Sequence, residues 1–161
     1  MSSMRKLVSI VVAAAVFLFA GSALAQPGAT PYGMPISMEN AKKAAAAAVA
    51  EAQKNNWNLV IAISDPGGNL VYFERVDGAP TGSGNVAIGK ARSAAIFKAP
   101  TKVFQERLAA GVTYLLTLDL VPIEGGIPIV LDGRIVGGIG VSGGSFQQDG
   151  QVASAGVAAL K

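Results

Sequence analysis

Two tight turns, each between apolar runs, constrain the fold of this chain more than any other feature of its sequence. The first is Asp-Pro-Gly-Gly-Asn at residues 65–69, which separates an apolar run at 59–64 from a second run at 70–75. Pro66 presets φ at the second turn position, and Gly67 accepts a positive φ at the third. Runs joined by so short a turn pair as antiparallel strands, so this segment predicts a β-hairpin.

The second turn is Asp132-Gly133, which lies between apolar runs at 127–131 and 134–141. Asp-Gly in this setting is the strongest short-range signal of a hairpin, because a type I′ turn needs a positive φ at both central residues. Pro128 cannot donate a backbone hydrogen bond, which places its strand at an edge of the sheet. The sequence therefore predicts a second hairpin in a mainly antiparallel sheet.

Helical patterns flank both hairpins. Ser37 is the expected N-cap of the first helix, which ends before Asn55. Three further helices are predicted at residues 85–98, 101–110 and 146–160. The apolar faces of these helices consist mostly of alanine, which allows close packing on a sheet. Since the central strands are apolar on both faces, we expect a three-layer α/β/α sandwich of the α+β class.

Residues 1–25 have the pattern of a secretory signal peptide. Arg5 and Lys6 precede a stretch at 7–19 that is apolar except for one serine, and Ala-Leu-Ala at 23–25 is a small-x-small cleavage site. The stretch is shorter than the roughly 20 residues that span a bilayer. An uncleaved N-terminal anchor is the alternative. We therefore expect a periplasmic or secreted protein that has no membrane attachment after cleavage.

The remaining sequence fits one domain at 37–161, preceded by an irregular arm at 26–36 that is rich in proline and glycine. Cleavage removes two of the 13 basic residues and leaves 11 against 10 acidic ones, a balance that does not favour nucleic-acid binding. The chain has no cysteine and no histidine. That excludes thiolate zinc sites, cysteine nucleophiles, Ser-His-Asp triads and haem ligation by imidazole. The carboxylates are too scattered to predict a metal site.

The segment 138–143 matches the pattern GxGxxG. A dinucleotide-binding fold would need a further parallel strand and an acidic residue about 20 positions later, but only 18 residues follow Gly143. Two interpretations remain open. The glycines allow a helix or a subunit to approach the strand closely, or the amides of residues 142–145 form an anion-binding nest at the start of the last helix.

Glu124 is a single carboxylate beside Gly125 and Gly126 in an otherwise apolar stretch. One interpretation is that it acts as a general acid or base. The other is that it accepts hydrogen bonds from nearby amides and shapes the turn. A cluster of basic residues also has two interpretations. It forms either a solvated helix face or a cationic rim that receives carboxylates or propionates. Its members are Lys90, Arg92, Lys98, Lys102 and Arg107.

Several of these segments together resemble the GlcG/HbpS-like family, whose members are described as haem-binding or haem-degrading. The resemblance runs from about residue 36 to residue 160. The matching stretches are AISDPGGNL at 62–70, FERVDGA at 73–79, KARSAA at 90–95, EGGIPIV at 124–130 and GIGVSG at 138–143.

The resemblance implies a profilin-like fold with a five-stranded antiparallel sheet, assembly into homo-oligomers and, in some members, binding of haem or a cobalamin-like ring. Without histidine, the candidate ligands of haem iron that we consider are Tyr72, Tyr114, Met34 and Met38. The family match and the basic helix together predict a set of ligand-binding residues. They are Arg75, Lys90, Arg92, Glu124, Gly125, Gly126, Ser142, Gly143 and Asp149.

Three functions follow as hypotheses. The first is an exported, oligomeric protein that binds a small ligand, with haem or a related tetrapyrrole as the leading candidate. The second is an enzyme that acts on a small oxygenated metabolite, with Glu124 as general acid or base. The third is an assembly protein without pocket chemistry, suggested by the glycine-rich and alanine-rich surfaces.

Overall fold

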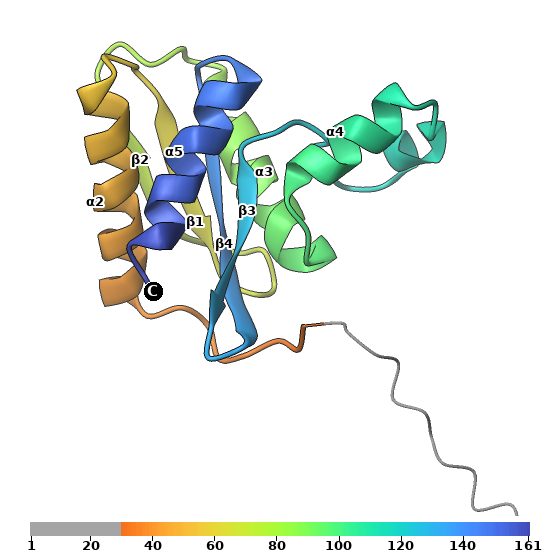
Figure 1. Cartoon of the computed structure of the whole chain (residues 1–161), viewed down its shortest axis with the longest axis horizontal. Helices are drawn as coiled ribbons and strands as arrows, with labels where there is room; N and C mark the ends of the chain where they lie inside the picture. Colours follow the sequence, from red (N-terminus) through yellow and green to blue (C-terminus); the bar gives the residue numbers. More distant parts are fainter. Residues whose placement is uncertain (1–29) are drawn as a thin grey trace, which may run out of the picture.

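The central sheet has four antiparallel strands in the order β2-β1-β4-β3 (Figure 1). The computed structural model describes residues 30–161, so the expected signal peptide and residues 26–29 of the arm lie outside the described part. Both predicted hairpins are confirmed. Their strands are β1 (Val60–Ser64), β2 (Leu70–Arg75), β3 (Gly126–Leu131) and β4 (Arg134–Ser142). Strand β3, which contains Pro128, is at an edge as predicted.

The prediction of five strands is wrong, since the described residues form a four-stranded sheet. The arm contributes a single parallel bridge instead, between Tyr32 and Ile135. There the Ile135 amide donates to Pro31 O at 2.8 Å, and the Gly33 amide donates to Ile135 O at 2.8 Å. Because Pro31 and Pro35 flank the bridge and have no backbone N–H, the arm cannot extend this pairing into a regular strand.

The two turns differ in how well local rules predict them. Asp132 and Gly133 have φ values of 49° and 70°, as a type I′ turn requires. In the first turn the positive φ, 81°, falls at Gly68, so its expected place at Gly67 is wrong. The Gly68 amide donates to Asp65 O at 3.0 Å, which makes Gly68 the fourth residue of the turn.

Helices cover both faces of the sheet, as expected for three layers (Figure 1). Helices α2 (Met38–Lys54) and α5 (Phe146–Ala158) pack on one face, and α3 (Ser83–Phe97) packs on the other. Helix α4 (Thr101–Ala109) and the short 3-10 helix η1 (Thr113–Thr117) project from the side of the molecule. Ser37 caps α2, since its Oγ accepts from the Asn40 amide at 3.2 Å.

Helix α3 lies directly on strand β4. A Cβ atom on Gly140 would overlap the backbone oxygen of Ala87 and the backbone nitrogen of Ala91, and one on Gly138 would overlap the backbone oxygen of Ala91. The interpretation that these glycines permit close approach of a helix is therefore confirmed. Within residues 30–161, no helix combines the length and apolar character needed to cross a bilayer.

Candidate functional site

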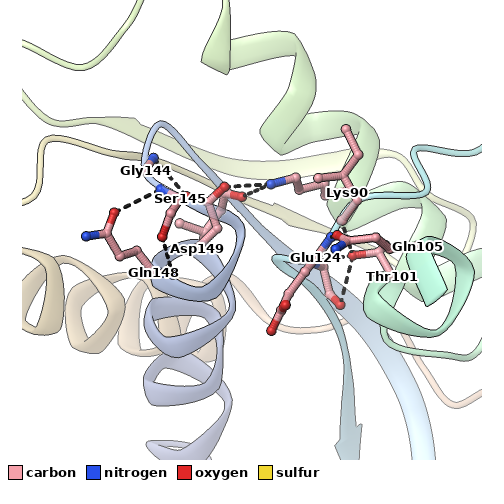
Figure 2. A network of polar contacts seen from close by, with 11 residues as sticks. Lys90, Thr101, Gln105, Glu124, Gly144, Ser145, Gln148 and Asp149 are labelled. Carbon is pink, nitrogen blue, oxygen red and sulfur yellow. Dashed lines mark hydrogen bonds and ion pairs between the residues drawn. The ribbon is translucent and has the colours of Figure 1, made fainter. Parts of the chain in front are cut away.

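A buried ion pair connects the helices on the two faces of the sheet. Lys90 Nζ of α3 lies 2.7 Å from Asp149 Oδ2 of α5, and the two side chains are only 1% and 3% exposed. Lys90 Nζ also donates to Val141 O at 2.9 Å, and Asp149 Oδ1 accepts from the Gly144 amide at 3.0 Å (Figure 2). Lys90 is therefore not part of a solvated helix face.

Burial acts against both charges of this pair. It lowers the pKa of Lys90, while the hydrogen bond and attraction of Asp149 oppose that shift. It also raises the pKa of Asp149, against the effects of Lys90 and the Gly144 amide. Because both side chains are buried and Lys90 Nζ is already bonded to Asp149 and to Val141 O, neither group is free to receive a charged ligand.

The turn that carries Glu124 is fixed by side chains of helix α4. Thr101 Oγ1 donates to Ile123 O at 2.6 Å and accepts from the Gly126 amide at 2.8 Å. Gln105 Oε1 accepts from the Glu124 amide at 2.7 Å (Figure 2). The sequence predictions missed Thr101 and Gln105, because their partners are about 20 positions away along the chain.

Gly125 allows this turn to pass directly over the buried pair. Its φ is 121°, and a Cβ atom there would lie 2.8 Å from Asp149 Cβ and 2.9 Å from Lys90 Nζ. The amide of Val141 donates to Gly125 O at 2.9 Å. The sequence EGG is thus explained by close packing on Lys90 and Asp149.

Glu124 borders a small cavity beside this turn. Its side chain is 14% exposed, and its Oε1 lies 3.3 Å from Nζ of Lys102, which is 53% exposed. The cavity has a volume of about 230 Å³, and we call it the Glu124 pocket. It is lined by Pro100, Lys102, Glu124, Gly125, Gly126, Ile127, Gly150 and Ser154.

A larger groove lies at the opposite end of the β3–β4 hairpin, where the arm meets the Asp132-Gly133 turn. Its volume is about 360 Å³, and we call it the Met34 groove. The Met34 side chain is 81% exposed. The groove is lined by Gly33, Met34, Pro35, Ile36, Ser37, Asn40, Leu131, Asp132, Arg134 and Val136.

The structure gathers about half of the proposed ligand-binding residues in one place. Lys90, Gly125, Gly126 and Asp149 lie together, with Glu124 on the neighbouring pocket wall. The remaining members make contacts of their own elsewhere in the fold.

The two arginines of the predicted set are engaged in separate contacts. Arg75, at the end of β2, donates to Ala79 O at 2.7 Å. Arg92 pairs with Asp119 at 2.7 Å on the surface. Both arginines therefore have partners other than Glu124.

The predicted anion nest after β4 is occupied by side chains of the protein itself. The Gly144 amide donates to Asp149, and the Ser145 amide donates to Gln148 Oε1 at 2.8 Å. Ser142 is buried at the end of β4, and Gly143 has a φ of 132°. The amides of residues 144 and 145 thus serve to cap α5, which has a capping box.

The possible haem ligands differ in availability. Tyr72 donates its hydroxyl to Glu74 Oε2 at 2.9 Å, whereas Tyr114 is 61% exposed and Met38 is 49% exposed. Across the described residues, no cluster of three or more acidic side chains forms a metal site.

Comparisons with known proteins match this chain along most of its length. A family model described as "Haem degrading protein HbpS-like" matches residues 36–158. Protein GlcG of Escherichia coli (strain K12) is 41% identical over 108 residues, which cover 66% of this chain and 81% of GlcG.

Two solved structures share both fold and sequence. The crystal structure of HbpS has a TM-score of 0.75 and 37% identity, covering 80% of this chain and 92% of the other. A crystal structure described as a PduOC:heme complex has a TM-score of 0.73 and 28% identity, covering 80% and 96%.

Proposed function

Since this chain belongs to the HbpS-like family, we propose that it binds a small ligand, with haem or a related tetrapyrrole as the leading candidate. The observation that carries the proposal is its similarity to the PduOC:heme complex, which is 28% identical and covers most of both chains. The family description, which names haem degradation, supports the same ligand class.

The residues of the Met34 groove fit such a ligand. A thioether is a common axial ligand of haem iron, and Met34 supplies one on an exposed wall. Arg134 can pair with a propionate, while Ile36 and Val136 provide apolar contact. Bound haem would supply an iron centre for redox chemistry, and the role of these side chains is to hold and orient the ring.

The two cavities differ in whether their volume suits a ligand as large as haem. The Met34 groove, at about 360 Å³, lies within the roughly 300–1,000 Å³ of typical ligand sites. The Glu124 pocket, at about 230 Å³, lies below it. Lys90, the cation expected to meet propionates, is buried against Asp149. These facts favour the groove.

Titration with haemin tests the proposal. We expect a Soret shift that saturates at micromolar haemin, and we expect Met34→Leu to weaken binding by about tenfold or more, equivalent to 1.4 kcal/mol. Met38→Leu tests the other candidate methionine, which is exposed but lies outside the groove lining, and it should bind as the unaltered protein does. A larger loss in Met38→Leu than in Met34→Leu would contradict the choice of the groove. Absence of a saturable shift in the unaltered protein would remove haem from consideration.

We further propose that the chain is exported and assembles into homo-oligomers. The pattern at 1–25 supports export, and exposed apolar side chains on the projecting η1 region support assembly. They are Tyr114, Leu116 and Leu118. Light scattering should give a mass several times that of one chain, and N-terminal sequencing should begin at Gln26. A monomer, or an intact N-terminus after secretion, would contradict the respective part.

A second candidate function is catalysis on a small oxygenated metabolite. The observation in its favour is that the Glu124 carboxylate, 14% exposed, faces a cavity beside the cation of Lys102. Glu124 would serve as general acid or base. Full activity of a Glu124→Gln variant on an identified substrate would exclude that role.

A further inference from the structure

We infer that the Glu124 pocket binds a small zwitterion, of which a free α-amino acid with a short side chain is the simplest example. This inference goes beyond haem binding and concerns a different cavity. It uses the pocket of the second candidate function but requires no turnover, so binding and catalysis can fail separately.

The pocket offers one charge of each sign at different depths. Glu124 lies deep, with 14% exposure, and Lys102 lies at the rim, with 53% exposure. An ammonium group can reach the glutamate while a carboxylate on the same molecule meets the lysine. A ligand with only one charge would leave the other pocket charge without a new partner.

The existing contact between the two side chains does not prevent this exchange. Their separation is 3.3 Å, and Lys102 is half in solvent. Such half-exposed pairs are weak, because water and salt screen them and a long side chain must be held in place. A zwitterion can therefore replace one weak ion pair by two.

The two charges behind the pocket wall compensate each other, so they do not change its preference for a zwitterion. Lys90 and Asp149 lie behind Gly125, and they compensate each other at 2.7 Å. Glu124 and Lys102 therefore set the charge selectivity of the cavity. Helix α4 begins at Thr101, between the pocket-lining residues Pro100 and Lys102, so the positive end of its dipole favours a ligand carboxylate at the rim.

The walls limit the size of the ligand. The volume is about 230 Å³, which is small for a drug-sized ligand. Pro100 and Ile127 offer apolar surface for a short side chain. Glycines keep the space open, since a Cβ atom on Gly150 would lie 2.6 Å from Glu124 Oε1.

The pocket is also held in place before any ligand arrives. Gln105 and Thr101 fix the backbone of the glutamate turn through hydrogen bonds of 2.6 to 2.8 Å. When a site needs little rearrangement, less binding free energy is spent on ordering its loops and side chains. The expected affinity is nevertheless modest, because few atoms of so small a ligand make contact.

Calorimetric titration of the purified full-length protein tests the inference. Glycine, alanine and valine should bind saturably, whereas acetate and methylamine, which each carry one charge, should bind about tenfold more weakly or worse. Tryptophan should bind more weakly than alanine, because its indole ring leaves little of the cavity for the two charged groups. Equal binding of acetate and alanine, or no saturable binding of any of the three amino acids, would overturn the inference.

Variants locate the binding. Glu124→Gln and Lys102→Met should each weaken alanine binding by about tenfold or more. Glu39→Gln and Lys42→Met, which change exposed charges on α2, are matched controls and should bind as the unaltered protein does. Loss of affinity in the controls, or full affinity in both pocket variants, would contradict the assignment.

Gly150→Ala provides a variant that keeps both charges. Its new methyl group meets the flexible end of Glu124, so the protein should fold while the carboxylate moves into the cavity. Alanine binding should fall, and the haemin titration should stay unchanged. Unchanged alanine binding in a folded Gly150→Ala protein would count against the pocket as the site.

Discussion

Replacing Lys90 by methionine should destabilise the protein by about 3–5 kcal/mol, the range found when one member of a buried ion pair is removed. Lys90 and Asp149 are 1% and 3% exposed, so the variant leaves a carboxylate in an apolar interior without its counter-charge. Urea denaturation followed by far-ultraviolet circular dichroism measures the free energy of unfolding.

Two further variants separate the lost pair from general damage to helix α3. The double variant Lys90→Met with Asp149→Asn removes both charges, and the carboxamide oxygen introduced at position 149 can still accept from the Gly144 amide. This double variant should therefore be more stable than Lys90→Met alone. Arg92→Met breaks the exposed pair with Asp119 on the same helix and should cost only about 0–1 kcal/mol. If Arg92→Met were as damaging as Lys90→Met, burial of the pair would not be the cause.

The stability deficit of Lys90→Met should shrink on acidification. Burial already raises the pKa of Asp149 above its ordinary value of 3.8, and Lys90 opposes this shift. Without Lys90 the folded-state pKa rises further. A raised folded-state pKa means that the native protein binds the proton more tightly than the unfolded chain does, so this group adds stability as the pH falls through that pKa. As the pH is lowered from neutral to mildly acidic, the unfolding curves of Lys90→Met should therefore move toward those of the unaltered protein.

The hairpins could be predicted from the sequence because their signals are local. Asp132-Gly133 carries the backbone preference of its own turn, and Pro128 marks its own strand as an edge. The absence of a fifth strand has no such local signal. It depends on where Pro31 and Pro35 fall relative to Ile135 of β4, 100 or more positions away.

The buried pair has a sequence signal of its own in the helical positions of its two members. Lys90 stands three positions after Ala87 and four before Ala94, so it lies on the apolar face of α3. Asp149 likewise precedes Val152 and Gly156 on the buried face of α5. A charged residue on an apolar helix face needs a partner of opposite charge. When two helices of one domain each carry such a residue, the two residues are candidates to pair.

The Glu124 pocket, in contrast, could not be assembled from sequence. Pro100 and Lys102 come from the start of α4, Glu124 from the turn before β3, and Gly150 from α5. No local pattern indicates that these segments meet. The turn and α5 meet only in the tertiary fold, where Gly125 packs on Asp149 and Glu124 packs on Gly150.

Replacing Gly140 by alanine should have the second large effect on stability. The new Cβ atom would overlap the backbone oxygen of Ala87 and the backbone nitrogen of Ala91. Since these are backbone atoms, no rotamer change relieves the overlap and α3 must move away from β4. We expect a loss of about 3 kcal/mol or more, at or above the top of the usual overpacking range. Thermal and urea unfolding measure it.

Gly84→Ala is the matched control for this change. Gly84 lies in α3, and its added Cβ would meet Phe73 at an ordinary 3.6 Å. The substitution should be neutral or stabilising by up to about 1 kcal/mol, because alanine favours helix.

A second variant tests the mechanism. Ala91→Gly removes a neighbouring side chain but leaves the overlapping Ala91 nitrogen and the Ala87 oxygen in place. The Gly140→Ala and Ala91→Gly double variant should therefore recover no stability, and recovery would show that side-chain packing, rather than backbone contact, sets the distance between α3 and β4.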